Sequence, residues 1–150
     1  MKKHTAVIVV FTCCLGVSAA QDAKKEMTAL QGSWKVVDYK GPEEAFAKEF
    51  KSKGKIIFDG DKLTIMIGDI KLGEATYKLD PSKKPKHIDV IPTEGANKDK
   101  AMLGIYALDG DKLTIFSHDD EKVRPKEFSY KAGDAGGLAT LQREAAEKKK

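Results

Sequence analysis

One short stretch of the sequence holds the densest group of side chains that could do chemistry. His118-Asp119-Asp120-Glu121 places an imidazole beside carboxylates, which are donors that a hydrolytic metal site uses. A metal-assisted hydrolase built on His118 and Asp120 is therefore one hypothesis. Hard carboxylates next to a single histidine more often belong to a solvated turn, so the sequence favours no metal site here.

A second candidate is the sequence Asp-Gly-Asp-Lys, which occurs at residues 59–62 and again at residues 109–112. Its carboxylates could contribute to a calcium loop, but each copy lacks the further acidic residues that such a loop needs. Asp-Gly between two apolar runs is the strongest local signal for a β-hairpin, because glycine readily adopts the positive φ of the tight turn. We therefore predict that both copies are hairpin turns.

The rest of the sequence contains no recognisable catalytic motif. There is no Gly-x-Ser-x-Gly sequence, and both cysteines, Cys13 and Cys14, lie in an apolar run near the N-terminus. Residues 133–137 are rich in glycine but lie between two expected strands, so they indicate a flexible connection rather than a phosphate-binding loop. Paired carboxylates could still meet in the folded chain. We predict no catalytic residue, no cofactor and no metal, and hence a protein that is not an enzyme.

The first twenty residues have the organisation of a signal peptide. Residues 1–4 are basic, residues 5–17 are uncharged and mostly apolar, and residues 18–20 are the small residues that signal peptidase requires. The apolar run is shorter than the ~20 residues of a membrane-spanning helix, so we expect no stable membrane anchor. We predict cleavage before Gln21 and export to the periplasm or the surrounding medium.

The remaining chain has the size and composition of one domain. Of the 150 residues, 41% are hydrophobic and 33% are charged, which is enough apolar material for a core. The excess of 27 basic over 23 acidic residues comes from lysines at the two ends of the chain. We therefore expect no cationic face and no nucleic-acid partner. The predicted domain spans residues 21–143 and is followed by a charged tail of residues 144–150.

From residue 33 onward, short alternating segments rich in Ile, Val, Tyr, Phe and Thr are separated by clusters of Gly, Asp, Pro and Lys, as is typical of all-β barrels. The predicted strands are Ser33–Lys40, Lys55–Phe58, Lys62–Ile67, Lys71–Leu79, Lys86–Ile91, Ala101–Leu108, Lys112–Phe116, Lys126–Lys131 and Leu138–Arg143. One short helix is predicted over Pro42–Lys51, where Phe46 and Phe50 share a face and could form a plug or a lid. Helical periodicity is otherwise almost absent. The fold class is all-β: an antiparallel up-and-down meander of eight to nine strands, with one short helix between the first two strands.

Two residues far apart in the sequence resemble a known pair. Gly32-Ser33-Trp34 opens the first predicted strand and Arg143 lies in the last, which resembles the Gly-x-Trp motif and closing arginine of lipocalin-like barrels. An arginine can stack its planar cation over an indole and bond to carbonyls at strand ends. The resemblance implies a lipocalin-like barrel whose first strand meets its last, with Trp34 and Arg143 closing one end.

A closer resemblance covers nearly the whole mature chain. It is carried by Leu30-Gln31-Gly32-Ser33-Trp34, by residues 77–86 (YKLDPSKKPK), by residues 104–111 (GIYALDGD) and by residues 124–128 (RPKEF). These motifs resemble a family of small exported lipocalin-like proteins of unknown function, expanded as paralogues in planctomycetes. The resemblance implies fold and export but no reaction. Members of that family often carry a cysteine after the second hairpin, where this chain has Ile115-Phe116-Ser117, so no role of that thiol transfers.

The interior of such a barrel is the expected working surface, because eight strands either enclose a filled core or hold one small ligand. The candidate lining residues are Phe58, Ile65, Tyr77, Ile88, Tyr106, Ile115, Phe128 and Tyr130. They give a mostly apolar wall with phenol hydroxyls that could orient a small apolar or amphipathic ligand. The same side chains could instead fill the barrel. The alternative function is therefore a non-enzymatic interaction or inhibitor protein, in which loops such as Asp80–Lys86 and Pro92–Lys100 contact an envelope protein partner.

Overall fold

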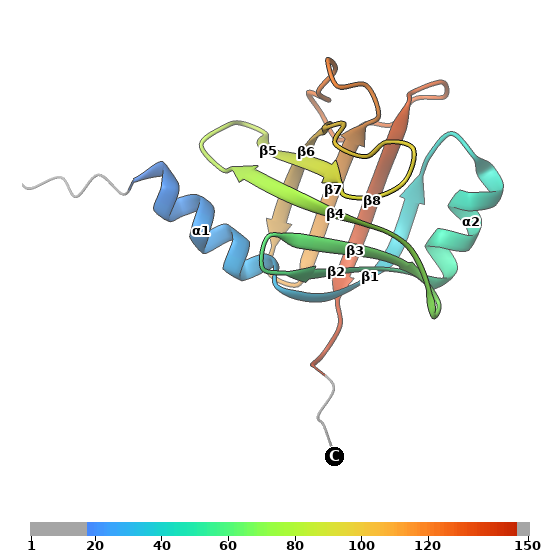
Figure 1. Ribbon diagram of the computed structural model, residues 1–150, viewed down its shortest axis with the longest axis horizontal. Helices are drawn as coiled ribbons and strands as arrows, with labels where there is room; N and C mark the ends of the chain where they lie inside the picture. Colours follow the sequence, from blue (N-terminus) through green and yellow to red (C-terminus); the bar gives the residue numbers. More distant parts are fainter. Residues whose placement is uncertain (1–17, 147–150) are drawn as a thin grey trace, which may run out of the picture.

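The computed structural model describes residues 18–146, which form a closed antiparallel barrel with a helix at each end (Figure 1). The strands are β1 (Gly32–Lys40), β2 (Gly54–Asp59), β3 (Lys62–Ile67), β4 (Ile70–Asp80), β5 (Lys86–Pro92), β6 (Met102–Asp109), β7 (Lys112–His118) and β8 (Gly136–Arg143), and the helices are α1 (Ala19–Leu30) and α2 (Glu44–Lys53). Each strand pairs with its neighbours in sequence, and β1 also pairs with β8. The predicted up-and-down meander, with a helix between the first two strands, is confirmed. Neither helix has the length and apolar character needed to cross a membrane.

The two Asp-Gly-Asp-Lys sequences form the predicted hairpin turns. Gly60 and Gly110 adopt φ values of 62° and 57°, a conformation that only glycine adopts at little cost. The turns join β2 to β3 and β6 to β7, and strand pairing begins directly at the aspartate and lysine on either side. The local sequence therefore fixed the register of both hairpins.

The predicted ninth strand, Lys126–Lys131, is wrong. These residues lie in the long connection between β7 and β8, and those two strands pair with each other directly. Pairing of β1 with β8 already closes the barrel, so no edge remains for another strand to join. Arg124 fastens the connection to the outside of the barrel, because it donates hydrogen bonds to the Gly104 carbonyl at 2.7 Å and to Asp89 Oδ1 at 2.7 Å.

Helix α1 was not predicted by the pattern of the sequence. Its residues are good helix formers, and Ser18 caps its start by accepting a hydrogen bond from the Ala20 amide at 3.4 Å. Its apolar residues near the C-terminus, Met27 and Leu30, pack against the barrel core. The predicted signal peptide lies almost wholly outside the described residues. Cleavage before Gln21 would shorten α1 at its start and leave this packed part in place.

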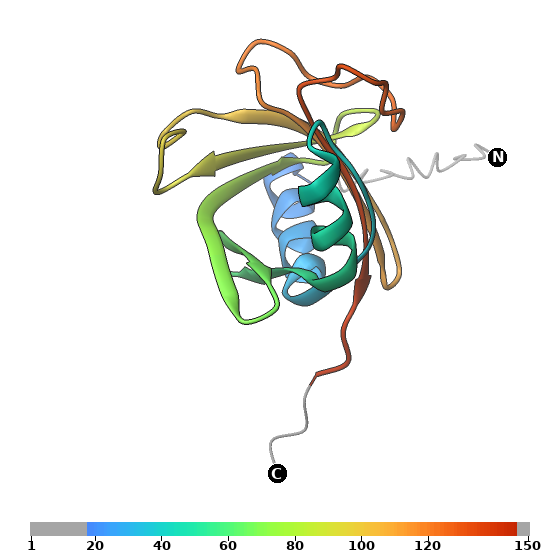
Figure 2. The same ribbon diagram turned by 90° about the vertical axis from the view of Figure 1, so that its right-hand side faces the viewer.

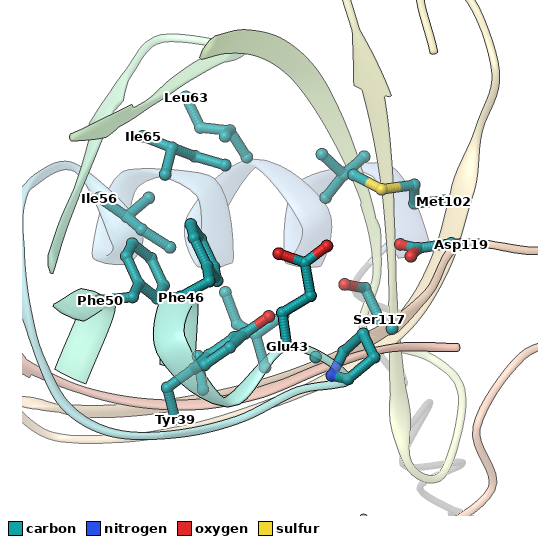
Figure 3. Close-up of a pocket in the computed structure, with 16 residues that line it drawn as sticks. Tyr39, Glu43, Phe46, Phe50, Ile56, Leu63, Ile65, Met102, Ser117 and Asp119 are labelled. Atoms are coloured by element: carbon teal, nitrogen blue, oxygen red, sulfur yellow. The ribbon is translucent and has the colours of Figure 1, made fainter. Parts of the chain in front are cut away.

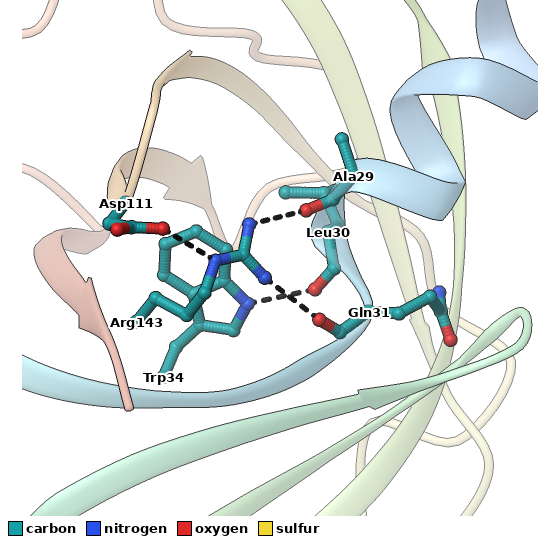
Figure 4. Close-up of polar contacts among 6 residues, drawn as sticks. All are labelled: Ala29, Leu30, Gln31, Trp34, Asp111 and Arg143. Atoms are coloured by element: carbon teal, nitrogen blue, oxygen red, sulfur yellow. Dashed lines mark hydrogen bonds and ion pairs between the residues drawn. The ribbon is translucent and has the colours of Figure 1, made fainter. Parts of the chain in front are cut away.

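One end of the barrel is closed by Trp34 and Arg143 (Figure 4). The guanidinium of Arg143 lies 4.2 Å from the centre of the fully buried Trp34 ring. Arg143 also donates to the carbonyls of Ala29 at 2.6 Å and Gln31 at 2.9 Å, while Trp34 Nε1 donates to the Leu30 carbonyl at 2.8 Å. Helix α1 has no basic residue in its last turn, so a side chain from the final strand neutralises its negative end. The predicted contact between these two residues is confirmed.

The half of the barrel next to Trp34 is filled by side chains. Phe58 and Tyr77 pack edge to face with ring centres 5.1 Å apart, and Ile88, Tyr106 and Leu113 are almost fully buried beside them. The hydroxyl groups of the two buried tyrosines, Tyr77 and Tyr106, form hydrogen bonds with α1 and with Gln31, which directly follows it. Tyr106 donates to Glu26 Oε2 at 3.1 Å, and Lys86 contacts the same carboxylate at 2.7 Å.

This arrangement predicts that alkaline pH destabilises the protein partly through Tyr106. Burial, followed by the charge and hydrogen bond of Glu26, raises the pKa of Tyr106 far above its ordinary value. Because the folded state holds this proton more tightly, its stabilising effect is complete below about pH 10, the pKa of an unfolded tyrosine, and is lost as the pH rises further. Urea unfolding between about pH 8 and pH 11 should show a steeper loss of stability in the wild type than in Tyr106→Phe. Equal losses of stability with pH in the two proteins would contradict this role of Tyr106. Tyr106→Phe should still lose some stability, because burial also raises the pKa values of Tyr39 and Tyr77.

Candidate functional site

The half of the barrel next to α2 encloses a cavity of about 380 Å³ (Figure 3). This volume lies within the roughly 300–1,000 Å³ that is usual for small-molecule sites. Its walls are mainly apolar side chains from the strands and from α2, namely Phe46, Phe50, Ile56, Leu63, Ile65, Val90, Met102, Ile115 and Ala139. Figure 2 looks along the barrel and shows α2 lying across this end, with α1 at the far end.

Helix α2 is held at the cavity by an aromatic cluster. Phe46 and Phe50 stack with ring centres 5.3 Å apart, and Tyr39 of β1 meets both rings edge-on at 5.7 and 5.0 Å. At the junction with β2, a Cβ on Gly54 would lie 2.2 Å from the Phe50 carbonyl oxygen, so only glycine allows the strand to start so close to the helix. The predicted helix therefore forms one wall of the cavity, and the cavity remains open beneath it.

The start of β8 consists of small residues that border the cavity. Gly136, Gly137 and Ala139 all line the cavity. A Cβ on Gly137 would lie 2.3 Å from the Tyr39 hydroxyl, and a Cβ on Gly41 would lie 2.6 Å from the same ring, so the two glycines hold Tyr39 between them. We expected residues 133–137 to form a flexible connection. This is wrong for Gly136 and Gly137, which are the first two residues of β8.

Polar groups are gathered at the mouth of the cavity. Glu43 precedes α2, Ser117 and Asp119 lie at the end of β7, and Figure 3 shows all three side chains directed toward the same space. Burial, together with the negative charges of Asp119 and Glu43 and the nearby Tyr130, raises the pKa of Tyr39 above its ordinary value. At neutral pH the Tyr39 hydroxyl therefore keeps its proton and can donate a hydrogen bond. Among the described residues, no lysine, arginine or histidine lines this cavity.

The predicted lining residues fall into three groups. Ile65 and Ile115 line the cavity as expected. Phe58, Tyr77, Ile88 and Tyr106 are buried in the filled half, and the hydroxyls of the two tyrosines are occupied by contacts with the N-terminal segment. Their inward direction is confirmed, but they do not border the cavity.

Phe128 and Tyr130 are corrections, because they lie in the connection between β7 and β8, outside the barrel. Phe128 is 36% exposed, and the Tyr130 ring packs 6.4 Å from Phe116. Phe116 is buried against this connection while its neighbours Ile115 and Ser117 face the cavity, as expected from the alternation of a strand. The aromatic alternation of residues 126–131 thus reflects packing on the outer surface.

The residues that suggested metal chemistry do not come together. His118 faces the outer surface of β7, Asp119 faces the cavity, and Asp120 Oδ1 accepts a hydrogen bond from the Lys122 amide at 2.8 Å in a turn. Within residues 18–146, no three His, Cys, Asp or Glu side chains form a group that could hold a metal ion. The hypothesis of a metal-assisted hydrolase therefore has no ligand group in this part of the chain.

Sequence reasoning missed the residues that make the site distinctive, namely Tyr39, Glu43, Ser117, Asp119 and the small residues of β8. The only signal was the run of glycine and alanine at residues 135–137, because glycine in a strand marks a place where another group approaches closely. No model of a protein family, no curated protein and no solved structure matches the chain.

Proposed function

We propose that this protein is an exported, lipocalin-like binding module that holds one small apolar or amphipathic molecule in the cavity next to α2. The observation that carries the proposal is the cavity of about 380 Å³, which has apolar walls and a polar mouth within an otherwise packed barrel. A concave apolar site with a few convergent polar groups is the usual form of a small-molecule site.

The contrast between the two halves of the barrel supports this function. Eight strands enclose a space that large side chains can just fill, as Trp34, Tyr77 and Tyr106 do at the other end, where they are at most 2% exposed. A side chain of the same size in place of Ala139, which lines the cavity from β8, would fill the second half in the same way. The space therefore depends on the small side chain of Ala139, and it is the place where a ligand can replace missing packing.

The alternative, an interaction or inhibitor protein, has weaker support from the geometry. It relies on a filled barrel that displays the loops Asp80–Lys86 and Pro92–Lys100. These loops lie at opposite ends of strand β5, so they do not form one continuous contact surface. We retain the prediction that residues 1–20 direct export, which would place the ligand outside the cytoplasm. The mass of the processed chain tests that prediction.

Binding can be tested with N-phenyl-1-naphthylamine, a neutral apolar probe whose fluorescence rises in apolar surroundings. We expect saturable binding of one probe per chain with a dissociation constant in the micromolar range, which corresponds to about −8 kcal/mol. Isothermal titration calorimetry should give the same stoichiometry and a negative heat-capacity change, because apolar surface is buried. A linear, unsaturable fluorescence response would overturn the proposed function.

A further inference from the structure

We infer that the ligand of this cavity is a cationic amphiphile, a molecule with an apolar body and a positively charged amine head, rather than a fatty acid. The inference rests on the proposed function and adds the chemical class of the ligand. It arises from the charges at the cavity mouth, where Glu43 and Asp119 supply two carboxylates and no described basic side chain lines the wall.

The charges of the two carboxylates at the mouth are not balanced by an ion pair within the described part of the chain. Asp38, Glu74, Glu94 and Asp111, among others, form ion pairs with lysine or arginine. Within residues 18–146, Glu43 and Asp119 form no such pair, so their negative charge is not compensated by a neighbouring side chain. A cationic head at the mouth would supply the missing opposite charge, whereas a carboxylate head would be repelled by both groups.

The two charges act on one point in the cavity. Both Asp119 and Glu43 contribute to the raised pKa of the Tyr39 hydroxyl, although they come from different loops. Gly41 and Gly137 hold that hydroxyl in place, and Ser117 adds a second hydroxyl nearby. An amine at this point can donate hydrogen bonds to both carboxylates and to the hydroxyl oxygens.

The apolar part of the cavity sets the orientation of the ligand. Ile56, Leu63 and Ile65 lie away from Asp119 in Figure 3, so an apolar body would extend toward them while the head stays at the mouth. Glu43 and Asp119 are exposed at the mouth, so the head can keep part of its hydration and need not be fully buried as an ion. Two carboxylates are fewer oxygen ligands than calcium takes, so a small cation alone is a poorer fit than an amphiphile.

Three ligands with the same tail test the inference: octylamine, 1-octanol and octanoate, which are cationic, neutral and anionic at neutral pH. Displacement of N-phenyl-1-naphthylamine from the purified protein should show octylamine binding about tenfold more tightly than octanoate, with octanol between them. Added salt should reduce this difference, because the carboxylates are exposed. Equal affinities, or tighter binding of octanoate, would overturn the inference while leaving the proposed function in place. Absence of probe binding would instead overturn the proposed function.

The double variant Glu43→Gln with Asp119→Asn should bring octylamine and octanoate to within about twofold of each other. The matched control is Glu44→Gln with Asp120→Asn, which removes the same charge from the adjacent residues outside the cavity lining. This control should keep the wild-type preference for the amine. Loss of the preference in both double variants would contradict a local site and assign the effect to net charge.

Discussion

Replacement of Trp34 by alanine is expected to lower the free energy of unfolding by about 4 kcal/mol, within the range for truncation of fully buried aromatic side chains. The indole is 0% exposed, and Arg143 stacks on it at 4.2 Å. Its removal would also leave the Leu30 carbonyl, which accepts a 2.8 Å hydrogen bond from Nε1, without its partner. The loss therefore combines a cavity, a missing hydrogen bond and a missing cation–π contact.

The stability loss can be measured by urea unfolding followed by circular dichroism, because Trp34 is the only tryptophan and its fluorescence disappears in the variant. Trp34→Phe keeps a ring beneath Arg143 and should cost about 2 kcal/mol. Probe binding to Trp34→Phe should stay within about twofold of wild type, because the cavity lies at the other end of the barrel. If Trp34→Ala lowered the free energy of unfolding by less than about 1 kcal/mol, the contacts of Trp34 would not be a major source of stability.

Ala139→Phe is expected to weaken binding of N-phenyl-1-naphthylamine by at least about tenfold, equivalent to about 1.4 kcal/mol. Ala139 lies on β8, pairs with Tyr39 on one side and Ile115 on the other, and lines the cavity. A phenyl ring at this position would occupy the space that we assign to the ligand. Because it enters an open space rather than a packed core, the stability should change by only about 1 kcal/mol or less.

The matched control for this variant is Ala107→Phe. Ala107 lies on β6 and is exposed, so the same side chain is added outside the barrel. Probe affinity should then equal that of the wild type. Unchanged binding in Ala139→Phe, measured on protein that unfolds cooperatively, would place the probe outside the cavity and contradict the proposed site.

The secondary structure followed largely from local patterns. Alternation of apolar and polar residues placed the eight observed strands, and the two Asp-Gly turns gave the hairpins, because a strand and a tight turn depend on neighbouring residues. The sequence pattern did not indicate helix α1, because its first turns carry mainly polar and small side chains and show no apolar face. Only Met27 and Leu30, near its C-terminus, pack against the barrel core. The strand predicted over residues 126–131 shows the opposite case, since alternation alone could not reveal that the barrel was already closed.

The sequence by itself determined the order of the strands and the register of the hairpins, while the pairing of Trp34 with Arg143 was expected from a resemblance to lipocalin-like barrels. Only the tertiary structure decided which inward-facing residues meet across the barrel and which border a space. Whether a barrel is filled depends on the combined volume of side chains from strands distant in sequence, here large residues around Tyr77 and the small Ala139 beside the cavity. The polar mouth has the same origin, because Glu43 and Asp119 belong to separate loops that closure of the barrel brings to one end.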